Sequence, residues 1–90
     1  MNPYKEKTLI NFKKAQSLLK KISSMVEDNI YCIDIMQQNL AVIGLLKSAH
    51  LMLMKGHFAT CFKSALASKN TKKKQQMVDE ILKVTSLFNR

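Results

Sequence analysis

Residues 40–54, LAVIGLLKSAHLMLM, are apolar around most of the circumference of a helix. Lys47, Ser48 and His50 are the polar interruptions, and the apolar residues between them keep a helical period. A helix this apolar is buried on several sides. A chain of 90 residues has few elements with which to cover it, so a subunit interface is the expected place for the remaining apolar surface.

The same period extends outward from this run over about residues 30–67. Gly44 and Gly56 are the weak points of the predicted long helix. Gly56 is expected to kink or loosen the helix without ending it.

Shorter helices are predicted on either side. An amphipathic pattern predicts a first helix over Lys5–Glu27, and either residue of the break Asp28-Asn29 is a candidate cap for the long helix. After the basic loop SKNTKKK, Thr71 is predicted to cap a third helix over Lys72–Leu87. The sequence therefore predicts an all-α fold, in a single domain over residues 1–90, with a medium, a long and a short helix.

The charge balance indicates a polyanionic partner. Fifteen basic residues against six acidic ones give a net charge of +9, which suits nucleic acid or a membrane surface, although a solvated lysine-rich surface is the simpler alternative. No apolar run reaches the ~18 residues of a membrane span, and the N-terminus lacks a secretion-signal pattern. We therefore expect a cytoplasmic protein. Without an acid–base pair, a nucleophile constellation or a phosphate loop, we predict neither an enzyme nor a small-molecule substrate.

The two cysteines lie far apart in the sequence. His57 and Cys61 are neighbours on one helix face at i and i+4, a spacing that suits two metal ligands but equally fits a half-exposed histidine beside a buried thiol. Cys32 precedes Cys61 by 29 residues, or roughly 43 Å of continuous helix, so one chain cannot bring them together unless the helix breaks.

A second copy of the chain resolves this separation. If two long helices pair antiparallel and cross near Leu45-Leu46, Cys32 of one copy lies level with His57 and Cys61 of the other, and symmetry builds the site twice. Two thiolates and an imidazole form a soft set of three ligands. Zn(II) normally takes a fourth ligand, so the pattern favours Cu(I).

The segment YCIDIMQQNLAVIGLLKSAHLMLMKGHFATCFKSAL strongly resembles the central helix of the copper-sensitive operon repressor family, and the resemblance extends over about residues 5–88. It implies an antiparallel helical dimer that pairs into a tetramer, with Cu(I) bound between protomers by Cys32, His57 and Cys61. It also implies that Tyr31 and Glu80 hydrogen-bond the non-ligating nitrogen of the histidine. The family's repressors bind operator DNA without metal and release it with Cu(I).

Sister classes within the wider group fit less well. Nickel and cobalt sensors need a histidine near the N-terminus, and residues 1–30 contain none. Persulfide sensors keep both cysteines but lack the histidine, so the presence of His57 favours a copper sensor. A thiol or persulfide sensor that uses the two cysteines is the alternative.

The sequence departs from the family where basic residues are expected to contact DNA. The arginine of the first helix is Asn11 here, and a basic position of the second helix is Ser48. One interpretation is that lysines contact the DNA phosphates instead: Lys13, Lys14, Lys20, Lys21 and Lys47. The alternative is a Cu(I) buffer or storage protein of the same fold that has lost specific DNA binding.

Overall fold

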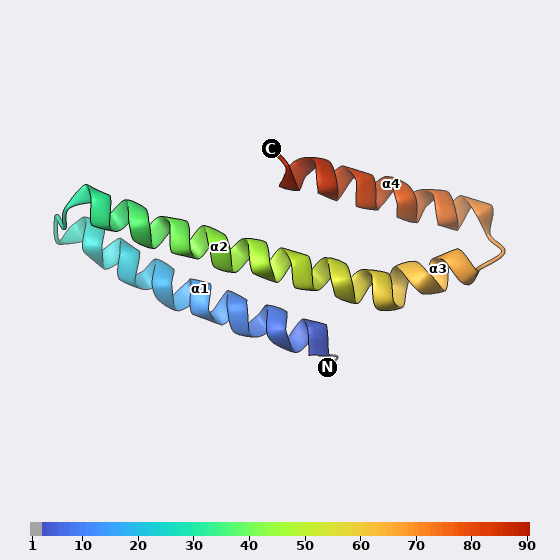
Figure 1. The fold of residues 1–90 in the computed structure, drawn as a ribbon, viewed down its shortest axis with the longest axis horizontal. Coiled ribbons are helices and arrows are strands. Elements are labelled where there is room, and N and C mark those ends of the chain that lie inside the picture. Colours follow the sequence, from blue (N-terminus) through green and yellow to red (C-terminus); the bar gives the residue numbers. More distant parts are fainter. Residues whose placement is uncertain (1–2) are drawn as a thin grey trace. The chain divides into compact units, whose positions relative to one another are not determined.

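A computed structural model describes residues 3–90, which form an all-α structure (Figure 1). The helices are α1 (Pro3–Glu27), α2 (Cys32–His57), the π-helix η1 (Phe58–Phe62), α3 (Lys63–Ala67) and α4 (Thr71–Phe88). Since α2, η1 and α3 follow one another without a break, the helical regions number three within the described residues, as predicted. The π-turn begins two residues after Gly56, so the expected loosening occurs without ending the helix.

The chain divides into two compact units, Met1–Gly56 and His57–Arg90. In the first unit, α1 and α2 form an antiparallel hairpin (Figure 1). Asn29, with φ of 54°, turns the chain, and the N–H groups of Asn29 and Ile30 donate to the carbonyls of Val26 and Met25. This is a Schellman motif, which satisfies the last carbonyls of α1.

The prediction that Asp28 or Asn29 caps the long helix was therefore wrong. Asp28 and Asn29 end α1, and the carbonyl of Tyr31 accepts the N–H groups of Asp34 and Ile35 at the start of α2. Asn29 cannot cap α2 because it adopts the αL conformation that ends the preceding helix.

Small side chains form the seam between α1 and α2. Thr8 and Ala15 on α1, and Val42, Ala49 and Gly56 on α2, are buried and recur every seven residues. At Gly56 the close approach is measurable, because a Cβ built there would lie 3.0 Å from the Cβ of Tyr4. Seven-residue spacing keeps one stripe facing the partner helix, and small residues let the two backbones approach closely.

In the second unit, α4 begins with a side-chain cap. The Oδ1 atom of Asn70 accepts the N–H of Lys73 at 3.1 Å, so the cap is Asn70 and not the predicted Thr71. Thr71 is instead the first helical residue. Asn and Thr both suit this position, and only the extended backbone of Asn70 decides between them.

Large apolar side chains remain outside the seam. Ile33, Met36, Leu40 and Ile43, three and four residues apart on α2, are between 40% and 65% exposed. On the helical wheel they point away from Val42 and Ala49. Among residues 3–90, each helix is too short or too polar to cross a membrane.

Candidate functional site

The two ends of α2 carry the predicted metal ligands. Cys32 is the first residue of the helix, and it is exposed and forms no disulfide. Tyr31, directly before it, is 66% exposed. His57 is the last residue of the 26-residue helix α2, which begins at Cys32.

His57 and Cys61 flank the start of the π-turn. Four residues slightly exceed one turn of an α-helix and fall just short of one turn of a π-helix, so both geometries keep this pair on one face. The thiol of Cys61 is exposed, and the hydroxyl of Thr60 donates to its sulfur at 3.6 Å. π-turns inside α-helices occur frequently at functional sites.

Two phenylalanines pack around the imidazole of His57. The ring centroids of Phe58 and Phe62 lie 6.2 Å and 6.1 Å from that of His57, and the two phenylalanine rings meet edge to face at 5.0 Å. These contacts restrict the orientation of the imidazole. The sequence identified both phenylalanines only as apolar positions, and their spacing of one and five residues from His57 was the available signal.

One chain does not assemble the complete predicted site. Within residues 3–90, no group of three or more His, Cys, Asp or Glu side chains comes together closely enough to hold a metal ion. The donor chemistry itself fits a soft metal, since two accessible thiols and an imidazole are the ligands that such ions prefer.

Glu80, the other predicted partner of the histidine, lies on α4. Its Oε1 atom accepts a hydrogen bond from the Gln76 amide at 3.4 Å, and one position earlier along the helix Gln75 donates to Asp79 at 2.9 Å. Both pairs have the i, i+4 spacing that brings side chains together on a helix. In the structure of the single chain, the carboxylate of Glu80 therefore has a partner on its own helix.

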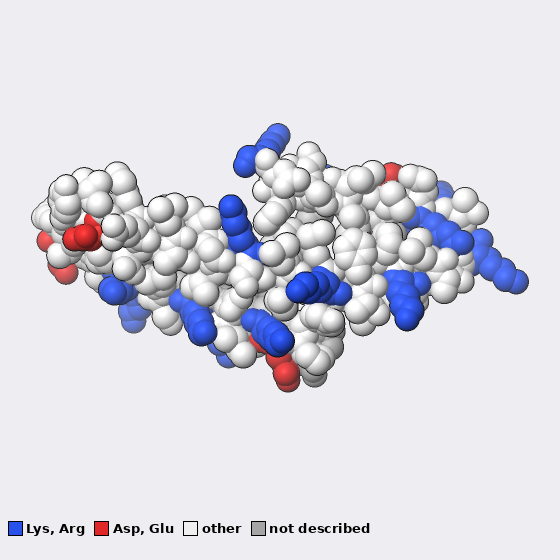
Figure 2. Space-filling model, in the orientation of Figure 1, with Lys and Arg blue, Asp and Glu red and all other residues white. Residues whose placement is uncertain are grey.

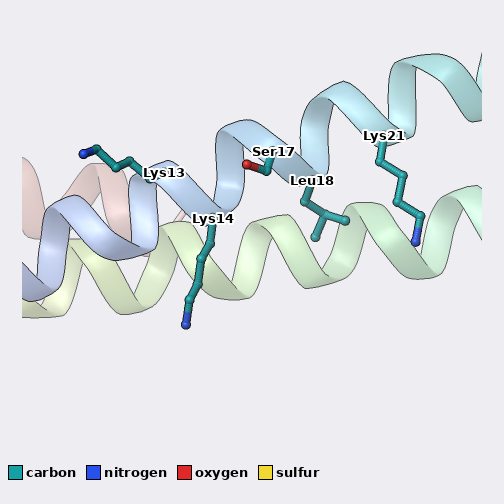
Figure 3. A pocket seen from close by; sticks show the side chains of 5 residues that line it. All are labelled: Lys13, Lys14, Ser17, Leu18 and Lys21. Atoms are coloured by element: carbon teal, nitrogen blue, oxygen red, sulfur yellow. The ribbon is translucent and has the colours of Figure 1, made fainter.

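The lysines proposed to contact DNA are exposed: Lys13, Lys14, Lys20 and Lys21 on α1, and Lys47 on α2. Lys13, Lys14 and Lys21 line a shallow hollow of about 470 Å³ together with Ser17 and Leu18 (Figure 3). Figure 2 shows lysines along α1, with acidic side chains near its two ends. The middle of α1 is therefore a positively charged surface.

Asn11 and Ser48, which replace the expected basic residues, lie next to each other. The side-chain amide of Asn11 donates to the Ser48 hydroxyl at 3.0 Å, and this bond joins α1 to α2. A second hollow, of about 210 Å³, is lined by both residues with Lys7, Ile10 and Met52. No contact between these two positions was anticipated from the sequence, because it depends on the register of the hairpin.

Comparison with known proteins gives the family. Residues 4–86 match the metal-sensitive transcriptional repressor family. The chain is 32% identical over 88 residues to a copper-sensing transcriptional repressor, CsoR, of Bacillus subtilis, which covers 96% of this chain and 84% of that protein. It is 32% identical over 78 residues to the protein of the same name in Mycobacterium ulcerans, covering 87% of this chain and 64% of that protein.

A third relative is similar over a shorter region. The Mycobacterium tuberculosis (strain H37Rv) protein of the same name is 34% identical over 62 residues, which is 69% of this chain and 52% of that protein. The chain thus spans about half to two thirds of the length of the mycobacterial relatives. The family consists of transcriptional repressors and not of enzymes, in agreement with the prediction. The match over nearly all of its residues shows that this chain belongs to the metal-sensitive transcriptional repressor family.

Proposed function

We propose that this protein is a Cu(I)-sensing transcriptional repressor that binds operator DNA without metal and releases it when Cu(I) binds. The observation that carries the proposal is the donor set: exposed Cys32 begins α2, and His57 and exposed Cys61 lie at its other end. Relatives that match most of the chain are named copper-sensing repressors. Such a repressor acts in the cytoplasm, where its operator DNA lies.

The site requires a second copy of the chain. The exposed stripe of Ile33, Met36, Leu40 and Ile43 supports an antiparallel pairing of two α2 helices, since it leaves apolar surface that one chain does not cover. In the proposed dimer, Cys32 of one protomer lies beside His57 and Cys61 of its partner. Two such dimers form the proposed tetramer.

The protein's own side chains orient the site. Phe58 and Phe62 restrict the ring of His57, and the donor set offers a three-coordinate centre of the kind that Cu(I) accepts. In the proposed metal-bound state, Tyr31 and Glu80 hydrogen-bond the second ring nitrogen of His57. Glu80 then exchanges its i, i+4 partner Gln76 for the imidazole, which links the metal site to α4.

The basic surface supplies the proposed DNA contacts. Lys13, Lys14, Lys20, Lys21 and Lys47 are exposed and bear the point charges that neutralise phosphates. If the metal-bound shape disfavours DNA, linkage requires DNA to weaken Cu(I) binding by the same factor.

Fluorescence anisotropy of the reduced apo-protein on duplex DNA from upstream of its own gene tests the proposal. We expect binding at fixed salt that is reversed by about one Cu(I) per protomer, as a symmetric dimer with two sites requires. An affinity for the duplex that does not change when Cu(I) is added would contradict the repressor function.

A Cu(I) buffer or storage protein is the second candidate. The neutral side chains of Asn11 and Ser48 favour it, because they stand where basic DNA contacts are expected and bond to each other. Tight Cu(I) binding with no affinity for the upstream duplex would support this candidate over the repressor.

A further inference from the structure

Five residues of α1 form one stripe along the side of the helix that borders α2. Lys7, Asn11, Lys14, Leu18 and Lys21 recur at intervals of four, three, four and three residues, which places them on one face. Both hollows of the α1–α2 hairpin lie along this stripe: Lys7 and Asn11 line one, and Lys14, Leu18 and Lys21 line the other. We refer to Lys7, Lys14 and Lys21 as the lysine ridge.

The ridge has a regular spacing. Its lysines are seven residues apart, which is about 10 Å along the helix axis. Figure 3 shows Lys14 and Lys21 extending to the same side of α1 with Leu18 between them. No acidic residue occurs between Lys7 and Val26, so nothing on the same stretch of α1 neutralises the ridge. Its spacing matches about three nucleotide steps along one DNA strand.

The Asn11–Ser48 hydrogen bond fixes the ridge against α2. The seam itself consists of small residues repeated every seven positions, so a slip of one repeat along α1 would again bring small residues together. A directional bond of 3.0 Å between one side chain of each helix distinguishes the correct register. Asn11 lies within the ridge, between Lys7 and Lys14, so the bond holds the part of α1 that carries both lysines.

We propose that the lysine ridge of Lys7, Lys14 and Lys21 binds phosphates about three nucleotides apart along one DNA strand, and that Asn11 and Ser48 are positioning residues that hold the ridge in register instead of contacting DNA. The inference rests on the proposed function, since it assumes that the chain binds duplex DNA. It adds Lys7 to the proposed DNA contacts and leaves out Lys5, which lies on another side of α1 and lines neither hollow.

The salt dependence of duplex binding by the full-length apo-protein tests the ridge. Replacing Lys7, Lys14 or Lys21 by Ala removes one phosphate contact from each protomer that touches DNA, so the slope of log affinity against log salt should fall by about 0.9 for each such protomer. Lys5→Ala is the matched control, with the same loss of charge on the same helix, and should keep the wild-type slope. Equal slopes for Lys5→Ala and Lys21→Ala would overturn the ridge.

A double-mutant cycle tests the positioning pair. Asn11→Ala and Ser48→Ala should each weaken DNA binding roughly fivefold, the usual worth of one hydrogen bond, and the double variant should be no weaker than either single one. Ser48→Thr, which keeps the hydroxyl, should retain wild-type affinity. Additive losses would mean independent DNA contacts, and stability losses without any loss of affinity would mean a purely structural bond. Either result overturns the positioning role.

The two proposals fail in different ways. A wild-type protein that binds no duplex would overturn the repressor function, and this inference with it. A wild-type protein that binds the duplex, with Lys5→Ala as harmful as the ridge variants, would overturn the inference alone.

Discussion

His57 is held by its neighbours along the chain as well as by its backbone. Phe58 and Phe62 both place their rings about 6 Å from the imidazole, and Cys61 follows it by one turn. Ring contacts of this kind reduce the rotational freedom that the imidazole has left to lose when it binds a metal. Because Phe58 and Phe62 belong to η1, a rotation of the imidazole would also displace side chains of the segment that follows α2.

Replacing His57 by Gln should therefore remove Cu(I) binding. We expect a loss greater than the roughly 10–100-fold that follows removal of an outer partner of a metal ligand, because a ligand itself is lost. His50→Gln provides the matched control, since these are the two histidines of the chain and His50 lies within α2, two turns before His57. A competition titration with a Cu(I) chelator measures both variants. Equal affinities for the two variants would exclude His57 as a ligand.

The ligands could be proposed from the sequence because their spacing carries geometric information. A long helix with Cys32 at one end, and with His57 and Cys61 at and just beyond the other, predicts that a partner molecule completes the site. The environment of His57 could not be predicted, because the contacts of Phe58 and Phe62 depend on a π-turn. Five residues are too few for the apolar pattern of the sequence to distinguish a π-turn from an α-turn.

At the scale of elements, the α1–α2 hairpin depends on its small residues. Gly56 meets Tyr4 so closely that an added Cβ would lie 3.0 Å from the Cβ of Tyr4, whereas nothing lies within 4 Å of a Cβ added to Gly44. Since the Cβ of Tyr4 is fixed to the backbone of α1, relief at Gly56 requires the helices to separate. Of these two glycines, only Gly56 is required by the close packing of α1 on α2.

Substituting each glycine by Ala should change stability in opposite directions. Gly44→Ala should stabilise the protein by about 1 kcal/mol through helix propensity. Gly56→Ala gains the same propensity but suffers overpacking of about 1–3 kcal/mol, so its net effect should be destabilising. Urea unfolding followed by circular dichroism measures both. Stabilisation by Gly56→Ala would show that α1 does not approach α2 as closely as described.

The start of α4 offers a second test at this scale. Asn70→Ala should cost about 1 kcal/mol, because the Lys73 N–H loses its acceptor. Thr71→Ala, one residue later, should change stability by less than about 0.5 kcal/mol, as expected for a surface substitution. Thermal unfolding of the two variants distinguishes the positions. A larger loss for Thr71→Ala would restore the cap predicted from the sequence.

Helix content was predictable in this chain, but the ends of helices were not. The three- and four-residue period placed α1, the long helical region and α4 within two residues of their observed bounds. Asn29 and Asn70 both precede a helix in the sequence, yet one ends the previous helix with φ of 54° and the other caps the next. Asparagine suits both conformations, and the surrounding backbone selects between them.

For the whole molecule, the exposed apolar stripe of α2 predicts self-association. Leu40 is 65% exposed in the single chain, and Leu82 on α4 is 63% exposed, so the two are matched in accessibility. Leu40→Lys should yield monomers by analytical ultracentrifugation, because it places a charge in the proposed α2 interface. Leu82→Lys should remain at least a dimer. A dimeric Leu40→Lys variant would exclude the stripe as the interface.

Mixing two inactive variants tests whether the metal site forms between chains. Cys32→Ser and Cys61→Ser should each lose tight Cu(I) binding as pure proteins. In a mixed dimer, Cys32 of the Cys61→Ser chain faces intact His57 and Cys61 of the other chain, so one of the two sites is restored. Refolding the variants together in equal amounts should give half mixed dimers, and hence tight binding of about one quarter Cu(I) per protomer. The chelator competition assay measures this fraction, and each variant refolded alone is the control. Mixtures that bind no more tightly than the separate variants would mean that Cys32 does not complete the site of a partner.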